Sequence, residues 1–279
     1  MRRETTLGIL SVIGIWLTAG IGLPLVNVLS MFTPEQLLVV RGFLTAAVVF
    51  VLLKGRVRAH DRYTYLIAPC VACAALGLFK AVRIWGAHPA VIIITTTPLV
   101  NFFITWRSGR RVPVAVVVGL VLLVAGVTIA RYESSFNPQG FAWICFATVC
   151  NGLLYELFTR ATATPYHRCF WGSIGIGTVG LCGSVHASWA PLTSDPSLGL
   201  ALMGFAVIHG FLYWVSNLYA FEYLPKDVAS VLAQGETPAV IVLATILLGE
   251  TLTGIQWIGV IIALTGAWYV MHWIDAEIT

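Results

Sequence analysis

A single carboxylate, Glu236, lies in the middle of a long apolar stretch of this chain. It follows Gly235 and precedes Thr237 and Pro238. Gly and Pro weaken the hydrogen-bond ladder of a helix and free backbone groups to face a cavity. A charged side chain within a membrane is costly and is a functional candidate by default. We therefore predict that Glu236 binds a substrate amine or a proton; a structural carboxylate paired with a neighbouring helix is the alternative.

Polar side chains recur at helical spacing in three other apolar runs. Such spacing places them on one face of a helix. A stripe of this kind suits a water-lined pathway, and it equally suits a hydrogen-bonded seam between helices. The residues that we expect along a substrate pathway are His209, Tyr213 and Asn217 in one run, Asn151 and Tyr155 in a second, and Thr97 and Asn101 in a third.

Four further residues complete the candidate pathway, and the first is Thr237, next to Glu236. We expect Trp16 to form part of its wall, although membrane tryptophans more often pack or anchor at interfaces. The guanidinium of Arg41 can bind a carboxylate or a phosphate through two hydrogen bonds. Lys80, together with Arg83, either reaches out to water or converges with Arg41 on an anionic substrate.

The composition identifies a membrane protein. Of the 279 residues, 58% are hydrophobic and 10% are charged. A soluble domain carries about 25% charged residues. The difference excludes a water-soluble globular enzyme, a disordered regulator and a nucleic-acid-binding module. The six cysteines are dispersed in or beside apolar runs and indicate buried small residues, not a disulfide framework. No ATP-binding loop or common membrane-hydrolase motif is present, and we expect no metal and no cofactor.

Apolar runs separated by charged or turn-rich breaks predict ten transmembrane helices. About 20 mostly apolar residues are needed to cross the hydrocarbon core. The runs are 7–29, 36–53, 64–83, 88–106, 112–130, 140–159, 167–187, 198–221, 227–248 and 253–273. The expected fold class is an all-α polytopic membrane protein.

The cations orient these helices. With the N-terminus in the cytoplasm, all of the 16 Lys and Arg residues except Arg41, Lys80, Arg83 and Arg131 fall on the cytoplasmic side. The positive-inside rule therefore favours this orientation. Ten spans then place the C-terminus in the cytoplasm as well.

The two halves of the sequence repeat. When the chain is displaced against itself by half its length, without gaps, Thr97 falls on Thr237 and Pro98 falls on Pro238. Under the same shift, Gly109 matches Gly249, Gly119 matches Gly259, and Gly126 matches Gly266. Five spans in each half, an odd number, give two inverted repeats, which we place at residues 1–132 and 133–279. Paired helix interruptions in such repeats point to a transporter site, here at Pro98 and at Gly235 and Pro238.

The second half carries a series of motifs: Leu-Pro-Lys-Asp-Val-Ala-Ser at 224–230, Glu236 with Pro238, Leu-Gly-Glu at 248–250, and then Gln256, Gly259 and Gly266. Mainly through these motifs, the sequence resembles the drug/metabolite transporter superfamily, and specifically its EamA-type members with two repeats. The first half matches the family at Arg41 and Pro98. Thr237 separates the glutamate from the proline, where the family often has them adjacent. The resemblance implies a ten-helix transporter that moves amino acids or related small metabolites, often outward.

We expect a secondary transporter in the bacterial inner (plasma) membrane, not an enzyme. It would work by alternating access around a midplane cavity lined by spans one, three, four, six, eight and nine, with a proton or substrate gradient as the energy source. Its partners are the lipid bilayer, a small-molecule substrate and protons; no nucleic acid is expected. An importer or exchanger of anionic or phosphorylated metabolites is the alternative within transport. A membrane enzyme or lipid-handling protein, with His209 beside Glu236, is the alternative of another class. The substrate, the direction of transport and the oligomeric state stay open.

Overall fold

A computed structural model describes residues 3–58, 61–85, 94, 96–107, 113–129, 137–189, 195–248 and 253–278. Within these ranges the regular structure is entirely helical, as expected from the apolar runs. The first-half helices are α1 (Arg3–Val28), α2 (Pro34–Leu52), α3 (Arg62–Trp85), α5 (Thr97–Arg107) and α6 (Val114–Ile129). The second-half helices are α7 (Pro138–Arg160), α8 (Pro165–Gly183), α10 (Pro196–Phe205), η1 (Ala206–Leu212), α11 (Tyr213–Tyr223), α12 (Lys226–Ala233), α13 (Glu236–Leu248) and α14 (Gly254–Ile278). The expected boundary between the repeats, near residue 132, lies outside the described residues.

Helix starts follow from local sequence. Proline occupies the first turn of α2, α7, α8 and α10, where its missing N–H breaks no helical hydrogen bond. The residue before that proline caps the helix in three of these cases. The hydroxyl of Thr33 accepts from the amide of Gln36, and the side chains of Asn137 and Asp195 accept from Gly140 and Ser197.

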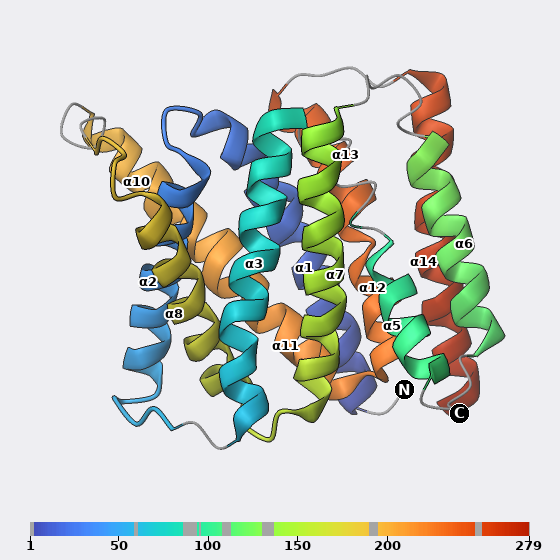
Figure 1. Cartoon of the computed structure of the whole chain (residues 1–279). Coiled ribbons are helices and arrows are strands. Elements are labelled where there is room, and N and C mark those ends of the chain that lie inside the picture. Colours follow the sequence, from blue (N-terminus) through green and yellow to red (C-terminus); the bar gives the residue numbers. More distant parts are fainter. Residues whose placement is uncertain are drawn as a thin grey trace.

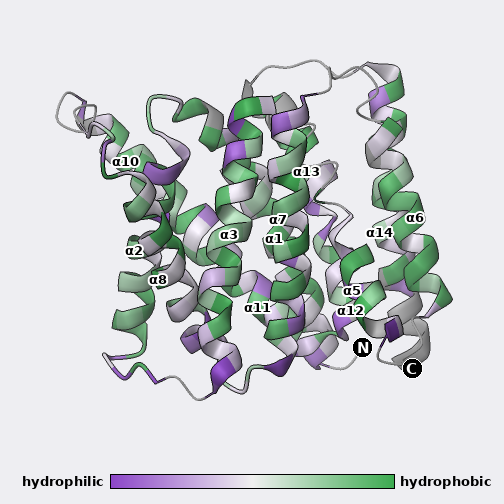
Figure 2. Cartoon of the chain, in the orientation of Figure 1, coloured by the Kyte–Doolittle hydropathy of each residue, from purple (hydrophilic) through white to green (hydrophobic). Residues whose placement is uncertain are grey.

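Within the described residues, five helical stretches are long and apolar enough to cross a membrane by themselves. They are Arg3–Val26, Pro34–Leu52, Arg62–Trp85, Pro138–Arg160 and Ser197–Tyr223, the last combining α10, η1 and α11. Shorter apolar helices occur at Val114–Gly126, Val228–Leu243 and Gly254–Val270. Hydrophilic residues gather toward the two ends of the bundle, and hydrophobic residues dominate between them (Figure 2). The chain is an integral membrane protein.

In the middle of the view α3 packs against α7, and α1, which packs against α11, lies behind them (Figure 1). On one side α2 packs against α8, and on the other α6 packs against α14. The start of α1 and the end of α14 lie at the same end of the bundle. Side chains from both halves of the sequence form one continuous core, which includes Ile15, Phe79, Ile144 and Leu218.

Glycine allows the closest helix contacts. A Cβ on Gly126 of α6 would lie 2.4 Å from the amide nitrogen of Ala263 and 2.5 Å from the carbonyl oxygen of Gly259, both on α14. A Cβ on Gly266 of α14 would lie 2.6 Å from the carbonyl oxygen of Gly119. The backbones of α6 and α14 therefore touch where glycine stands in both helices.

The helix that carries Glu236 is interrupted. α12 ends at Ala233 and α13 begins at Glu236, with Gln234 and Gly235 in a turn between them. Pro238 falls in the first turn of α13, and Pro98 falls in the first turn of α5. Pro98 and Pro238, which we predicted to interrupt helices, thus lie in the first turn of a helix, and Gly235 lies in the turn before α13.

Candidate functional site

A cavity lies between α2, α3, α7, η1, α11 and α13. Its volume is about 50 Å³, counted as the space open to the centre of a water molecule. One water needs about 10–15 Å³ by that measure, so the cavity has room for several. Most of its walls are apolar, with a limited set of polar groups, as is typical of small-molecule sites. The polar lining consists of Arg41, Asn151, Tyr155, His209, Tyr213, Asn217 and Glu236.

Glu236 is the carboxylate of this cavity. It is 6% exposed, and its Oε2 accepts a hydrogen bond of 3.1 Å from the hydroxyl of Tyr213 on α11. Among the described residues, no cation lies within ion-pair distance of it. The carboxylate is therefore held by a neutral donor and has oxygen lone pairs left to bind a further donor.

Arg41 is the cation of the same cavity. It is 4% exposed, and its guanidinium carbon lies 5.6 Å from the ring centre of Phe79 and 5.8 Å from that of Tyr213. Its Nε is buried without a hydrogen-bond partner, and no carboxylate of the described chain pairs with it. Aromatic faces thus stabilise the charge of a guanidinium whose Nε has no hydrogen-bond partner in the described part of the chain.

His209 lies in η1, a π-helical turn within an otherwise α-helical span. Its ring stacks on Phe79, with the planes 17° apart, and lies 5.0 Å from the ring of Tyr213. Neither ring nitrogen has a hydrogen-bond partner in the described part of the chain. π-Helical turns occur often at functional sites. Here the turn brings an imidazole to the cavity beside Arg41 and Tyr213.

The two predicted stripes on α7 and α11 also reach the cavity. Asn151 donates to the hydroxyl of Tyr155 across one turn of α7, at 3.4 Å. Asn217 donates to the backbone carbonyl of Tyr213 at 3.0 Å. These bonds fix the orientation of side chains that line the cavity.

The helices around the cavity differ from the set that we expected. We predicted that the first span would line it and did not include the second. In the structure α2 contributes Arg41, and no described residue of α1 is part of the lining. The physical reason is close packing of η1 on α2, where a Cβ on Gly210 would lie 2.3 Å from the hydroxyl of Thr45. That approach places Arg41 against His209 and Tyr213.

Five of the other candidates lie outside this lining. Thr97 and Asn101 are buried in α5, where the hydroxyl of Thr97 donates to the carbonyl of Ile94 at 2.6 Å. Both polar atoms of the Asn101 side chain lack a partner in the described part of the chain. Thr237 is buried in α13. Trp16 of α1 donates through Nε1 to the carbonyl of Leu232 at 2.7 Å.

Lys80, the fifth, lies near the end of α3 that we expect to be outside. Its amine forms an ion pair of 2.7 Å with Glu35 at the start of α2. Arg83, one turn further on, donates to the backbone carbonyls of Leu29, Ser30 and Phe32. These two cations are engaged by the protein and do not join Arg41 in the cavity.

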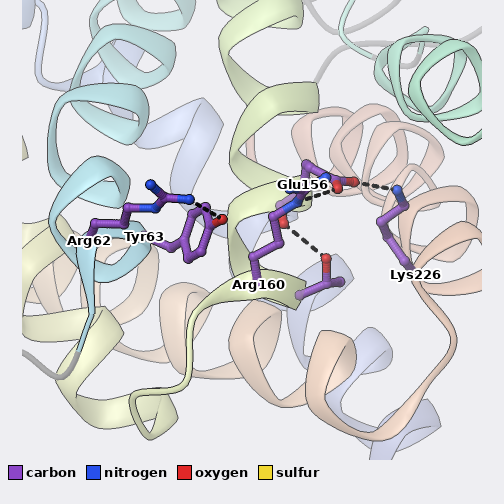
Figure 3. A network of polar contacts seen from close by, with 6 residues as sticks. Arg62, Tyr63, Glu156, Arg160 and Lys226 are labelled. Carbon is purple, nitrogen blue, oxygen red and sulfur yellow. Dashed lines mark hydrogen bonds and ion pairs between the residues drawn. The ribbon is translucent and has the colours of Figure 1, made fainter. Parts of the chain in front are cut away.

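Ion pairs also join helices at the opposite end of the bundle. Glu156 of α7 binds Lys226 at the start of α12 at 2.5 Å and Arg160 at 2.7 Å (Figure 3). In the same view Arg62 donates to the hydroxyl of Tyr63 at 3.0 Å. Nearby, Arg168 pairs with Glu222 and also donates to the carbonyls of Phe158 and Ala163. Charged contacts therefore tie helices together both above and below the cavity.

Sequence reasoning missed the apolar part of the site. Phe158 and Trp214 line the cavity, with ring centres 5.7 Å apart. Apolar residues of α3 also line it, namely Val71, Ala74, Ala75 and Leu78. In a chain that is mostly hydrophobic, one apolar residue is not distinguishable from its neighbours by type or spacing. The π-helical turn around His209 had no clear signal either. No three His, Cys, Asp or Glu side chains come together as a metal site within the described ranges.

Residues 138–271 match the EamA-like transporter family. The match lies in the second half of the chain, and over these residues it confirms the resemblance seen in the sequence to the drug/metabolite transporter superfamily, to which that family belongs.

A solved crystal structure of a protein that is 14% identical in sequence has the same fold, with a TM-score of 0.78 over 95% of each chain. None of the curated proteins matches the sequence. The fold is therefore shared with a solved protein.

Proposed function

We propose that this chain, whose second half matches the EamA-like transporter family, exports amino acids or related small metabolites by alternating access. One observation carries the proposal. Arg41 and Glu236 line the same buried cavity, yet neither has an ion-pair partner among the described residues. A zwitterion that places its carboxylate on Arg41 and its ammonium group on Glu236 satisfies both.

Energetics favour a ligand that carries both charges. A buried charge without a partner is costly, because the interior does not replace its hydration. The guanidinium of Arg41 can hold a carboxylate through two parallel N–H···O bonds. The lone pairs of Glu236 that Tyr213 leaves open can accept an ammonium N–H. The same carboxylate can take a proton when no amine is bound, which would couple efflux to proton entry.

We also propose ten spans in two inverted repeats, and glycine contacts support this. Under the shift that aligns the two halves, Gly119 corresponds to Gly259, and Gly126 corresponds to Gly266. If the halves are equivalent, a contact between Gly119 and Gly266 requires a corresponding contact between Gly259 and Gly126. The structure contains both contacts. Exchange of the two halves thus maps one contact onto the other, as a twofold axis between α6 and α14 requires.

Alternating access needs closure on each side of the cavity in turn. The ion pair of Lys80 with Glu35 joins α2 to α3 at one end, and that of Glu156 with Lys226 joins α7 to α12 at the other. We propose that these contacts break alternately. The second pair lies on the side of most Lys and Arg residues, which supports placing both termini in the cytoplasm of a bacterial inner membrane.

The proposal is tested by counterflow in proteoliposomes. Unlabelled substrate is loaded inside, and uptake of labelled amino acids and of phosphorylated metabolites is followed for the wild type, Arg41→Gln and Glu236→Gln. We expect saturable flux of an amino acid, reduced about tenfold or more in both variants. Arg62→Gln is the control, since this exposed guanidinium donates to the neighbouring Tyr63.

Two results contradict the proposal. Saturable flux of phosphorylated anions without flux of any amino acid would favour the anion transporter. Full amino-acid flux in both variants would mean that the cavity is not the binding site.

A further inference from the structure

The interruption between α12 and α13 is built from short-range backbone bonds. The amide of Gly235 donates to the carbonyl of Leu232 at 3.0 Å, and that of Thr237 donates to the carbonyl of Gln234 at 3.0 Å. These bonds span three residues, whereas an α-helix spans four. In a regular α-helix the carbonyl of Gln234 would accept from the amide of residue 238, but Pro238 has no N–H. The amide of Thr237 donates to that carbonyl instead. The turn therefore ends one helix and starts the next in the same direction.

The indole of Trp16 gives the carbonyl of Leu232 a second hydrogen bond, besides that from the amide of Gly235. In an uninterrupted helix the carbonyl of Leu232 would accept from the amide of Glu236. Here Nε1 of Trp16 donates to that carbonyl at 2.7 Å. Trp16 belongs to α1, so a residue of the first half satisfies a backbone group at the helix break of the second half.

The ring of Trp16 also fills the space beside the break. A Cβ on Gly235 would lie 2.4 Å from Cε2 of Trp16 and 2.6 Å from its Nε1. No side chain fits at position 235 while the indole keeps its place. The ring of Trp16 therefore packs directly against Gly235, while its N–H donates to the carbonyl of Leu232.

We infer that Trp16 is a positioning residue for Glu236, acting through the break at Gln234 and Gly235. Glu236 is the first residue of α13, so the angle at which α13 starts sets where its carboxylate lies against Tyr213. The role of Glu236 in binding rests on the proposed function, whereas its placement by Trp16 does not. Loss of the indole N–H leaves the carbonyl of Leu232 with the amide of Gly235 as its donor, removes the bond that joins the break to α1, and loosens the start of α13.

The test measures how fast Glu236 reacts with dicyclohexylcarbodiimide, an apolar reagent for carboxyl groups, by mass spectrometry of the purified full chain. Trp16→Phe keeps an aromatic ring but removes the N–H, and Gly235→Ala displaces the ring. We expect both variants to raise the reaction rate of Glu236 about threefold or more. In counterflow, both should raise KM more than they lower the maximal rate.

Matched controls separate positioning from general damage. Trp257 is an exposed tryptophan of α14, and a Cβ on Gly204 of α10 would meet no atom within 4 Å. Trp257→Phe and Gly204→Ala should therefore react as the wild type does. Thermal unfolding is followed for each variant, and rates are compared well below the midpoint.

The labelling needs no transport substrate, so its outcome is independent of the proposed function. Wild-type reaction rates at Glu236 in both Trp16→Phe and Gly235→Ala would overturn the inference. Faster reaction in these two variants without any amino-acid flux would retain the positioning role and reject the proposed function alone.

Discussion

The hydroxyl of Tyr213 can be removed without removing its ring. It donates to Glu236 at 3.1 Å, while the ring packs beside Arg41 and His209. Tyr213→Phe should therefore raise the half-saturation concentration for an amino acid about tenfold, since hydrogen bonds to charged groups contribute more than neutral ones. Counterflow at varied substrate concentration measures this, and an unchanged half-saturation concentration would show that the hydroxyl plays no part in placing the carboxylate.

At the residue scale, the polar side chains of the site could be predicted from the sequence. A polar side chain in an apolar run is costly within a membrane and therefore indicates a functional site. This argument identified Glu236, His209 and Asn151. The structure brings all three to one cavity. Trp16 shows the limit of such reasoning, since its bond to Leu232 joins residues far apart in the chain and depends on the helix break.

Among the elements, the contact of α6 with α14 depends on glycine. A Cβ on Gly126 would lie 2.4 Å from a backbone atom, which cannot move aside as a side chain can. Gly126→Ala should separate the helices and destabilise the protein by about 1–3 kcal/mol, as overpacking does. Thermal unfolding in detergent measures the loss. Gly204→Ala serves as the control, and an equal effect in both variants would contradict close packing as the cause.

The start of α3 gives a prediction with a pH dependence. The carboxylate of Asp61 accepts from the amides of Thr64 and Thr162, at 2.8 and 2.7 Å, and from the hydroxyls of both. Burial raises the pKa of Asp61, but these hydrogen bonds outweigh it and hold the pKa below its ordinary value. The ionised form is therefore favoured by folding, and its contribution is present above the unfolded pKa of about 3.9.

Asp61→Asn should consequently lower the unfolding midpoint at neutral pH. Because the folded pKa is depressed, the wild type loses its advantage as the pH falls below about 4. Unfolding of both proteins at a series of pH values measures the difference. A difference that stays constant down to low pH would show that ionisation of Asp61 is not its source.

Helix positions were more predictable than helix irregularities. Charged and proline-containing breaks indicated where helices begin, and Thr33 and Asn137 cap them as local chemistry requires. Gly235 and Pro238 indicated an interruption near Glu236, which the structure places at Gln234 and Gly235. The π-helical turn η1 could not be predicted, because it depends on the packing of Gly210 against Thr45 of another helix.

For the whole molecule, the positions of the cations predict which end faces the cytoplasm. Arg58 follows the end of α2 and His186 follows the end of α8, and both are exposed. These two helix ends lie at opposite ends of the bundle (Figure 1). The exposed native thiol of Cys182 is first removed by Cys182→Ser. A membrane-impermeant maleimide added to intact cells should then label His186→Cys and leave Arg58→Cys unlabelled until the membrane is opened. The reverse pattern would invert the proposed orientation.

The central claim is that Arg41 binds the carboxylate of a substrate whose amine binds Glu236. The direct measurement compares the half-saturation concentration of the best transported amino acid with that of the amine lacking its carboxylate, in the wild type and in Arg41→Gln. We predict that loss of the carboxylate weakens binding to the wild type about tenfold or more, and leaves binding to Arg41→Gln nearly unchanged. An equal loss in both proteins would contradict the account.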